Sequence, residues 1–387
     1  MNILIIRNYP SYMSVKNNTY NIQEIGLAKA LVRRGHKCDI VFWTDKQEES
    51  VTIPVPRSNN GVITVFYKNG ITALKNTIFI GCDELFSEYD VLQPCEYNQI
   101  ESWILAKKYP NKTVIYHGPY YSSFNKRYNL MCKLFDLFFL GLYRKNKTQF
   151  IVKSRLAENF LKCKGISNID VAGVGIDIEM LSDNKSESDQ LIYKKMLLDE
   201  GDNKLLYVGR FEQRRNITFL LDVFKKVNQE LPNSKLYMIG NGDKHYIEKC
   251  WEYARDIGVY DKIVWQKKIE QKQLSDIYKL SDCFILPTYY EIFGMVLLEA
   301  MYYRNLVVTN INGGSSTLIT HGVTGIIIDS WEHQEWAEKI VFYMKDRKKR
   351  KLIVENASKT IGDSFTWDKL APIFEKCYLN KLKNETR

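Results

Sequence analysis

Two carboxylates stand on either side of an expected helix start within the 387-residue chain. Glu291 precedes a Phe-Gly pair, and Glu299 lies inside the apolar run 295–301. Residues 287–288 end a strand-like run, so a loop should lead into the helix. The first amides of a helix lack intrahelical acceptors and bind anions such as a diphosphate. We expect Glu291 at the rim of such a site and Glu299 one to two turns deeper, each able to accept hydrogen bonds from hydroxyl groups. The amides concerned are those of Phe293, Gly294, Met295 and Val296.

Arginines follow the buried strand expected at 204–208. Arg210 comes directly after Gly209, and Arg214 and Arg215 follow within a few residues. The guanidinium group is a rigid, permanently charged fork that suits phosphate oxygens. Doubly wound folds bind their ligands at the carboxyl ends of strands. These arginines are therefore candidates for a phosphate site, and the alternative is a surface loop, which is equally plausible for Arg214.

The composition describes a globular protein that favours anionic partners. Hydrophobic residues make up 45% of the chain, charged residues 26%, and the formal net charge is +10. No nucleic-acid-binding motif is present, so we expect nucleotides or phospholipid head groups as partners and no nucleic acid. The eight cysteines are dispersed without metal-ligand spacing, which is typical of reduced core residues in a cytoplasmic protein. No apolar run is long enough to span a membrane.

Strand-like and helix-like runs alternate in two halves, which predicts an α/β protein with crossover helices. A polar, acidic stretch at about 183–203 indicates an interdomain connection. We expect two doubly wound domains facing a cleft. The expected strands of the first half are 3–6, 38–43, 62–67, 78–80, 91–92, 113–116 and 149–152. In the second half we expect strands at 204–208, 235–239, 262–265, 283–286 and 306–309, and helices at 216–230, 243–257, 270–280 and 294–303.

The segment from Glu291 to Glu299, with the turn at 310–314 and the Gly-Val-Thr-Gly run at 322–325, resembles the retaining GT-B glycosyltransferases of glycosyltransferase family 4, the glycosyl transferases group 1. That family carries a Glu, seven residues and a second Glu, with Phe-Gly after the first. The resemblance implies the GT-B architecture of two Rossmann-like domains. Residues 1–182 would form an acceptor-side domain, 203–364 a nucleotide-sugar-binding domain, and the C-terminal helix 365–387 would pack back on the first domain.

The resemblance also implies roles for single residues. Arg210 matches an Arg that holds the donor diphosphate, and Arg215 takes the place of a Lys with the same task. Glu299 would hold ribose hydroxyls, and Glu291 would fix hydroxyls of the transferred sugar. His117 matches a His that faces this sugar, although a lone His at a strand end is more often packed or solvated. We take His117 and Glu291 as the catalytic candidates.

The chain departs from the family pattern at several places. Asn17-Asn18-Thr19 replaces the Gly-Gly pair of the first loop, and Gly118 replaces the Asp that often follows the His. Thr317 stands where a Glu often follows the later Gly-Gly pair. Lys267 stands where the family has a Gly. In the family, backbone near that position contacts the nucleobase, so Lys268 is a further donor-binding candidate. The resemblance is therefore stronger in the second domain, which binds the donor.

We expect neither a metal ion nor a cofactor, because the nucleotide sugar is itself a substrate. The chain has no Asp-x-Asp motif, by which other sugar transferases hold a divalent metal ion. Arginines and a helix N-terminus can neutralise the leaving diphosphate instead.

The sequence thus predicts a retaining glycosyltransferase. A UDP-sugar is the expected donor, although nothing in the sequence excludes GDP or ADP, and the expected acceptor is a carbohydrate or a lipid-linked saccharide in cell-surface polysaccharide or glycoconjugate synthesis. The alternatives are a nucleotide-sugar epimerase and a non-catalytic glycosyltransferase-like scaffold. The altered loop at 17–19 favours the scaffold, whereas the two glutamates and Arg210 argue against it.

Residues 124–150 place basic side chains around an aromatic, apolar centre. This pattern suits an interfacial helix at an anionic membrane surface, which would make the protein peripheral at the inner face of the membrane. The alternative is a core helix of the first domain whose basic flanks reach solvent. The run 138–140 leaves little polar face and favours at least partial burial.

Overall fold

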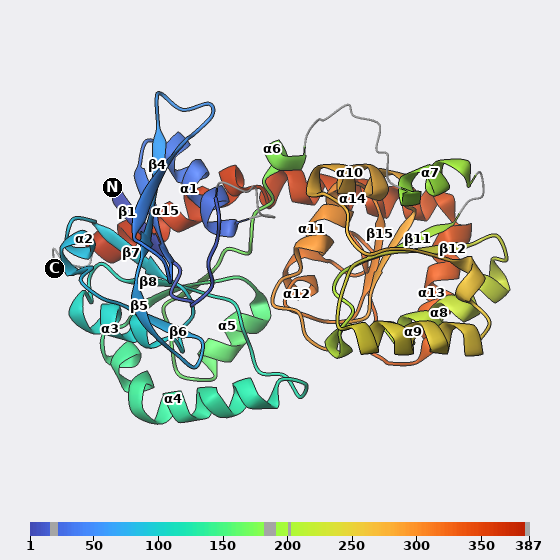
Figure 1. The fold of residues 1–387 in the computed structure, drawn as a ribbon, viewed down its shortest axis with the longest axis horizontal. Helices are drawn as coiled ribbons and strands as arrows, with labels where there is room; N and C mark the ends of the chain where they lie inside the picture. The colour runs from blue at the N-terminus through green and yellow to red at the C-terminus, as the bar shows by residue number, and fades with distance from the viewer. Residues whose placement is uncertain (16–21, 182–190, 200–202, 384–387) are drawn as a thin grey trace. The chain divides into compact units, whose positions relative to one another are not determined.

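The computed structural model describes residues 1–15, 22–181, 191–199 and 203–383. They divide into two compact units, Met1–Asp177 with Thr366–Arg387, and Ile178–Phe365 (Figure 1). The loop residues Asn17-Asn18-Thr19 and most of the acidic connection at 183–203 lie outside the described residues.

The first unit is built on a mainly parallel sheet. Over the described residues its strand order is β3-β4-β2-β1-β7, and bridges from β7 to β8 continue this order into β8-β9-β10. Among the described strands of this sheet, only β3 runs antiparallel to its neighbour. Four of the five β1 residues are buried, as expected for a strand covered on both faces. The strands are β1 (Asn2–Ile6), β2 (Lys37–Trp43), β3 (Glu49–Pro54), β4 (Val62–Lys68), β7 (Val91–Pro94), β8 (Val114–His117), β9 (Gln149–Val152) and β10 (Ile169–Val171).

Helices α1 (Gln23–Arg33) and α15 (Trp367–Lys383) pack together against the strands of the first unit. The indole of Trp367 lies so close to Gly26 and Gly175 that a Cβ atom at either glycine would overlap it. The last helix is thereby fixed to the first unit. The other helices of this unit are α2 (Asp83–Ser87), α3 (Ile100–Lys108), α4 (Lys126–Lys145) and α5 (Arg155–Lys162).

The second unit has one parallel sheet with the strand order β13-β12-β11-β14-β15-β16 across its described residues. Numbered within the unit, this order is 3-2-1-4-5-6, which is that of the doubly wound dinucleotide-binding fold. Its strands are β11 (Lys204–Val208), β12 (Lys235–Ile239), β13 (Ile263–Gln266), β14 (Cys283–Leu286), β15 (Leu306–Thr309) and β16 (Ile326–Ile327).

Helices cover both faces of this second sheet (Figure 1). One layer consists of α8 (Ile217–Glu230), α9 (Lys244–Asp256) and α13 (His333–Lys345). The other consists of α7 (Leu191–Leu198), α10 (Gln271–Leu280), α11 (Met295–Tyr302) and α14 (Arg347–Ser364). Short helices α6 (Ile178–Leu181) and α12 (Ser315–Leu318) and the 3₁₀ turns Gln213–Arg215 and Tyr260–Lys262 complete the unit.

The expected α/β class is confirmed, and the strands expected at 204–208, 235–239, 283–286 and 306–309 have those bounds. One expected strand lies outside the main sheet. The run at 78–80 belongs to β6 (Asn76–Phe79), which pairs antiparallel with β5 (Gly70–Ala73) outside the main sheet. Strand β3 was not predicted, because its partly exposed residues lack the continuous apolar run of a central strand.

Candidate functional site

Most of the expected donor-binding residues lie at one point of the second sheet. Strands β11 and β14 are neighbours, and the chain leaves β11 toward α8 and β14 toward α11, which cover opposite faces. This is the topological switch point, outside whose carboxyl ends open α/β sheets bind ligands. Arg210 follows β11 by two residues, and Glu291 follows β14 by five.

Glu291 forms ion pairs with two arginines from the neighbouring strand end. Its Oε2 lies 2.6 Å from Nη2 of Arg215 and 3.3 Å from Nη1 of Arg214. Glu291 is 9% exposed, so the expectation that it stands at a rim was wrong. Burial opposes ionisation of Glu291, but the charges of Arg215 and Arg214 outweigh it and lower the pKa of the carboxyl. Glu291 is therefore a carboxylate whose position is set by arginines.

Two hydrogen-bond donors of the Arg215 side chain are left without an acceptor in the described structure. Its Nε and Nη1 atoms are buried and have no hydrogen-bond partner among the described residues. Leaving charged donors unpaired inside a protein costs free energy, which a further anion would recover. The Arg215 side chain thus holds Glu291 through Nη2, and its positive charge suits a phosphate group that binds at these strand ends.

The expected helix start is confirmed, since α11 begins at Met295. Gly294 adopts the left-handed conformation with φ 78°, and no side chain caps the helix. The amides of Gly294, Met295 and Val296 donate to no acceptor within the described part of the chain, while Phe293 donates to Oε1 of Glu291 at 3.4 Å. These amides at the positive end of the helix form an anion site.

The turn after β15 supports the loop that carries Glu291. The amide of Gly313 donates to the carbonyl of Glu291 at 3.0 Å. A Cβ atom on Gly313 would overlap the carbonyl oxygen of Ile292, and one on Gly314 would overlap that of Phe293. Only glycine lets the turn at 313–314 lie this close to the backbone of residues 292–293, which is a structural reason for the Gly-Gly pair.

Glu299 lies deep in the second unit. It is 1% exposed, and its Oε2 accepts a hydrogen bond of 3.0 Å from the hydroxyl of Tyr278 on α10. Glu299 is therefore not a solvent-facing residue of the helix. Tyr278 was not predicted, because no sequence pattern connects α10 with α11.

Two further candidates are exposed. The backbone of Arg210 is held by the Tyr207 hydroxyl, which donates to its carbonyl at 2.9 Å, while its side chain makes no ion pair with any described residue. Lys268 is exposed after β13, two strands away from β11, and likewise has no ion-pair partner in the described ranges. The structure therefore brings Arg215, Glu291 and the α11 amides together and leaves Lys268 apart from them.

His117 belongs to the first unit and lies in a separate buried cluster. Its Nδ1 is 2.7 Å from Oε2 of Glu96. A carboxylate only accepts hydrogen bonds, so Nδ1 carries a proton and donates it. The Nε2 atom is buried and has no hydrogen-bond partner among the described residues. The side chain stacks on Phe160, with ring centroids 5.5 Å apart.

Two further residues, Glu96 and Lys153, complete this cluster and were not predicted from the sequence. The Gly118 amide donates to Oε2 of Glu96 at 2.9 Å, and Nζ of Lys153 lies 3.7 Å from Oε1. Burial raises the pKa of Glu96, but Lys153 and the hydrogen bonds from His117 and Gly118 more than compensate and lower it. Glu96, His117 and Lys153 lie at or just after the carboxyl ends of β7, β8 and β9, so strand-end position was the signal that pointed to them.

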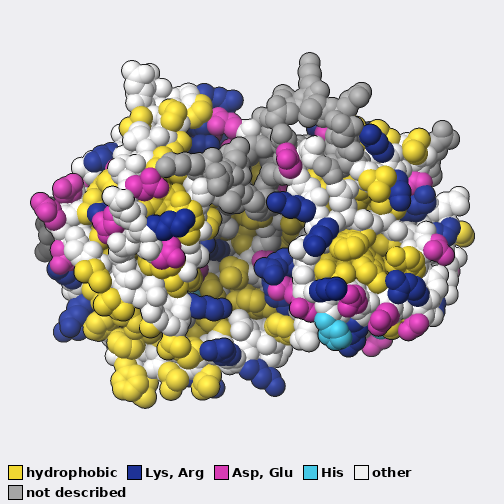
Figure 2. All heavy atoms as spheres, in the orientation of Figure 1, with side chains coloured by type: hydrophobic (Ala, Val, Ile, Leu, Met, Phe, Trp, Pro, Cys, Tyr) yellow, Lys and Arg dark blue, Asp and Glu magenta, His cyan; other side chains and the backbone are white. Residues whose placement is uncertain are grey.

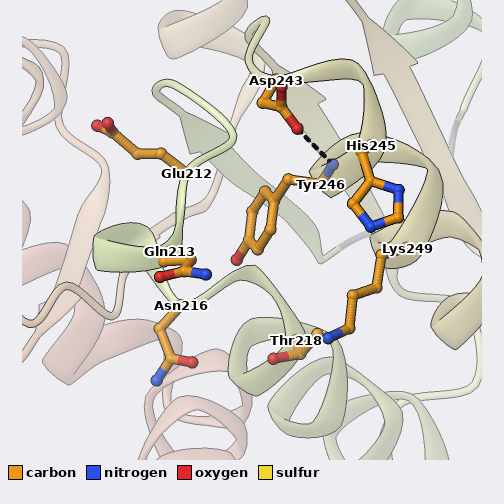
Figure 3. Close-up of a pocket in the computed structure, with 8 residues that line it drawn as sticks. All are labelled: Glu212, Gln213, Asn216, Thr218, Asp243, His245, Tyr246 and Lys249. Atoms are coloured by element: carbon orange, nitrogen blue, oxygen red, sulfur yellow. Dashed lines mark hydrogen bonds between the residues drawn. The ribbon is translucent and has the colours of Figure 1, made fainter.

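A separate hollow of about 610 Å³ lies in the second unit. Figure 3 shows Tyr246 in its middle, with the Tyr246 amide donating to the Asp243 side chain at 3.0 Å. None of the predicted donor-binding residues lines the hollow, so we give it no part in the donor site. Its lining residues are Glu212, Gln213, Asn216, Thr218, Asp243, His245, Tyr246 and Lys249.

No group of three or more His, Cys, Asp or Glu residues in the described ranges could hold a metal ion. No helix within those ranges is long and apolar enough to cross a membrane.

Comparison with known proteins supports the interpretation of the second unit. Residues 188–360 match the family model of the glycosyl transferases group 1. An uncharacterized glycosyltransferase of Methanocaldococcus jannaschii is 26% identical over 365 residues, covering 89% of this chain and 90% of the relative. A D-inositol 3-phosphate glycosyltransferase of Segniliparus rotundus is 26% identical over 174 residues, covering 44% of this chain and only 38% of the relative.

Solved structures extend the likeness to nearly the whole chain. The Anabaena protein HepE, solved in complex with UDP, has a TM-score of 0.73 at 15% identity and covers 98% of this chain and 100% of its own. Sucrose-phosphate synthase from Thermosynechococcus elongatus has a TM-score of 0.71 at 16% identity, with coverage of 99% and 100%. The chain therefore has the GT-B fold.

Proposed function

We propose that this chain, whose residues 188–360 belong to the glycosyl transferases group 1, is a retaining glycosyltransferase that requires no metal ion. It moves a sugar from a nucleotide-diphosphate sugar to a carbohydrate or lipid-linked saccharide acceptor. The observation that carries this proposal is the buried guanidinium of Arg215, with two unpaired donors, at the same strand ends as the amides of Gly294 to Val296.

The donor diphosphate suits this arrangement chemically. Arg215 and the exposed Arg210 supply positive charge, and the α11 amides supply oriented hydrogen-bond donors. Each charge-assisted hydrogen bond is worth about 1.5–3 kcal/mol. Glu299 holds ribose hydroxyls, and Glu291, fixed by its arginines, accepts hydrogen bonds from the transferred sugar. Lys268 is the weakest of the donor-binding candidates, because the structure leaves it apart from the others.

UDP is the nucleotide that we propose for the donor. HepE has been solved with UDP and with UDP-glucose. These ligands are those of that neighbour, and they support a UDP-sugar as the first donor to test here.

The proposed reaction needs no nucleophile from the protein. The bond between the anomeric carbon and the diphosphate oxygen breaks while the acceptor oxygen bonds to that carbon on the same face. The acceptor proton passes to the leaving diphosphate oxygen, so charge and protons balance. Arg210, Arg215 and the α11 amides stabilise the negative charge that develops on the diphosphate.

His117 is proposed to bind the transferred sugar through Nε2. Nδ1 donates to Glu96, so Nε2 is the ring atom that remains to contact a sugar hydroxyl. The eight cysteines are unpaired, and seven of them are buried, which supports a reducing compartment such as the cytoplasm.

The test is mass-spectrometric detection of free UDP, GDP or ADP from a panel of nucleotide sugars, with and without cell-envelope lipid extract. We expect diphosphate release that depends on the extract and is lost in Glu291→Gln. Lys249→Met, which removes a charge from the separate hollow, is the matched control and should retain release. Conversion of the donor sugar without any acceptor would indicate an epimerase, and donor binding without turnover would indicate a scaffold.

A further inference from the structure

Helix α4 of the first unit is apolar on two opposite faces. One face is buried and includes Cys132, Phe135 and Tyr143. The Tyr143 hydroxyl donates to the carbonyl of Tyr97 at 2.8 Å, which ties this face to the core. The alternative of a core helix is therefore correct for this face.

The opposite face of α4 carries large apolar side chains exposed to solvent. Leu137 is 74% exposed and Phe138 is 73% exposed. The spacing of the exposed residues follows the helical period, so they form one continuous stripe. Figure 2 shows apolar side chains gathered along the edge of the first unit where Figure 1 labels α4. The stripe, which we call the α4 stripe, consists of Leu130, Met131, Leu134, Leu137 and Phe138.

The exposed charges on α4 are all basic. The single acidic residue of the helix, Asp136, is only partly exposed and pairs with Lys164. None of the basic residues forms an ion pair with a described acidic residue, so their charge is available to a partner. They lie in the first turn, beside the stripe and in the last turn of the helix: Lys126, Arg127, Lys133, Arg144 and Lys145.

We infer that the α4 stripe docks on an anionic lipid bilayer. A helix lying in the interface buries its apolar face among acyl chains while its basic residues contact anionic head groups. The 20-residue helix is about 30 Å long and can lie flat on such a surface. Charge complementarity identifies the occupant, because a second copy would set the same five basic side chains against one another.

This inference goes beyond the proposed function and does not depend on it, since docking requires neither donor nor acceptor. Failure of vesicle binding would leave the transfer reaction untouched, and absence of transfer would leave docking untouched. If both hold, the acceptor is expected to be a lipid-linked saccharide presented at the bilayer surface.

The experiment is co-flotation of the full-length protein with two kinds of vesicle. One contains phosphatidylglycerol mixed with phosphatidylcholine, and the other contains phosphatidylcholine alone. We expect binding to the anionic vesicles that weakens with added salt and is much weaker on the neutral ones. Absence of wild-type binding to the anionic vesicles would overturn the inference.

Two sets of variants locate the surface. Replacing Leu137 and Phe138 together by Gln should reduce partitioning by about tenfold or more. Replacing Lys126 and Lys133 together by Gln should reduce it by roughly fivefold for each charge removed. All four side chains are exposed, so the fold should be retained, which circular dichroism checks.

Matched controls come from α14, which begins with a basic run but lacks an apolar stripe. Lys348 is an exposed lysine of that run, and Leu352 is 60% exposed. Lys348→Gln and Leu352→Gln should each leave vesicle binding unchanged. Equal loss in the α14 and α4 variants would overturn the inference. The inference would also be overturned if the wild-type protein failed to bind vesicles but sedimented as a dimer, and the Leu137/Phe138 variant sedimented as a monomer.

Discussion

Nη2 of Arg215 lies 2.6 Å from Oε2 of Glu291, although the two residues follow different strands of the second sheet. The pair joins the loop after β11 to the loop after β14 at the point where the sheet reverses its winding. Each residue therefore holds the other before any ligand binds. Preorganisation of this kind lowers the cost of ordering side chains on binding.

The Glu291 ion pair predicts a specific dependence of stability on pH. The pKa of Glu291 is lowered in the folded protein, so its ionised form stabilises the fold above its unfolded-state pKa of about 4.3. That contribution is lost as the pH falls through the lower folded-state value. Chemical denaturation should show that the difference in unfolding free energy between wild type and Glu291→Gln is constant above about pH 6 and shrinks below about pH 4. The exposed substitution Glu338→Gln should show no such trend, and an identical trend in both variants would contradict the account.

Glu101 should give the opposite pH dependence. Burial raises the pKa of this carboxyl to about 8, far above the unfolded value. The folded state therefore binds more protons than the unfolded state between about pH 4.3 and about pH 8, and wild-type stability falls over that interval relative to Glu101→Gln. Thermal unfolding at several pH values checks this, with the exposed Glu84→Gln as control. A Glu101→Gln variant that gains no relative stability as the pH rises would contradict it.

Glu96→Gln should impair transfer without changing donor affinity. The neutral amide loses the charge that favours proton donation from Nδ1 of His117, and it no longer balances Lys153. A lost charge-assisted hydrogen bond is worth about 1.5–3 kcal/mol, so kcat should fall by roughly tenfold to hundredfold. The dissociation constant of UDP should stay the same, because the donor-binding residues belong to the second unit. Glu84→Gln serves again as control, and unchanged kcat in Glu96→Gln would exclude a positioning role for Glu96.

Gly313→Ala should reduce both stability and UDP binding. The added methyl group would overlap the carbonyl oxygen of Ile292 and displace the loop that carries Glu291. Gly362→Ala is the matched control, because no atom lies within 4 Å of its Cβ position in α14. That substitution should be neutral or stabilising by about 0.5–1 kcal/mol. Calorimetric melting and UDP titration compare the two, and equal behaviour would contradict the supporting role of Gly313.

The second unit was largely predictable from sequence because its central strands are buried on both faces. Strands such as Lys235–Ile239 and Leu306–Thr309 are continuous apolar runs, which a helix layer on each side requires. The first unit was less predictable, since β3 and the β5–β6 hairpin are partly exposed and mix polar with apolar residues.

The candidate site was predictable in its residue types and not in its pairings. The helix start at Met295 follows from local pattern alone. The ion pair of Arg215 with Glu291 and the hydrogen bond of His117 with Glu96 depend on which strands become neighbours, and no local pattern encodes that.

The central claim is that the guanidinium group of Arg215, held in place by Glu291, binds the donor diphosphate. The most direct measurement is calorimetric titration of UDP into wild type, Arg215→Lys, Arg215→Met and the control Lys249→Met. The account predicts that Arg215→Met weakens UDP binding by about tenfold or more, because at least one charge-assisted hydrogen bond is lost. Arg215→Lys should retain part of the affinity, and Lys249→Met should bind UDP like wild type. Wild-type affinity for UDP in a folded Arg215→Met variant would contradict the account.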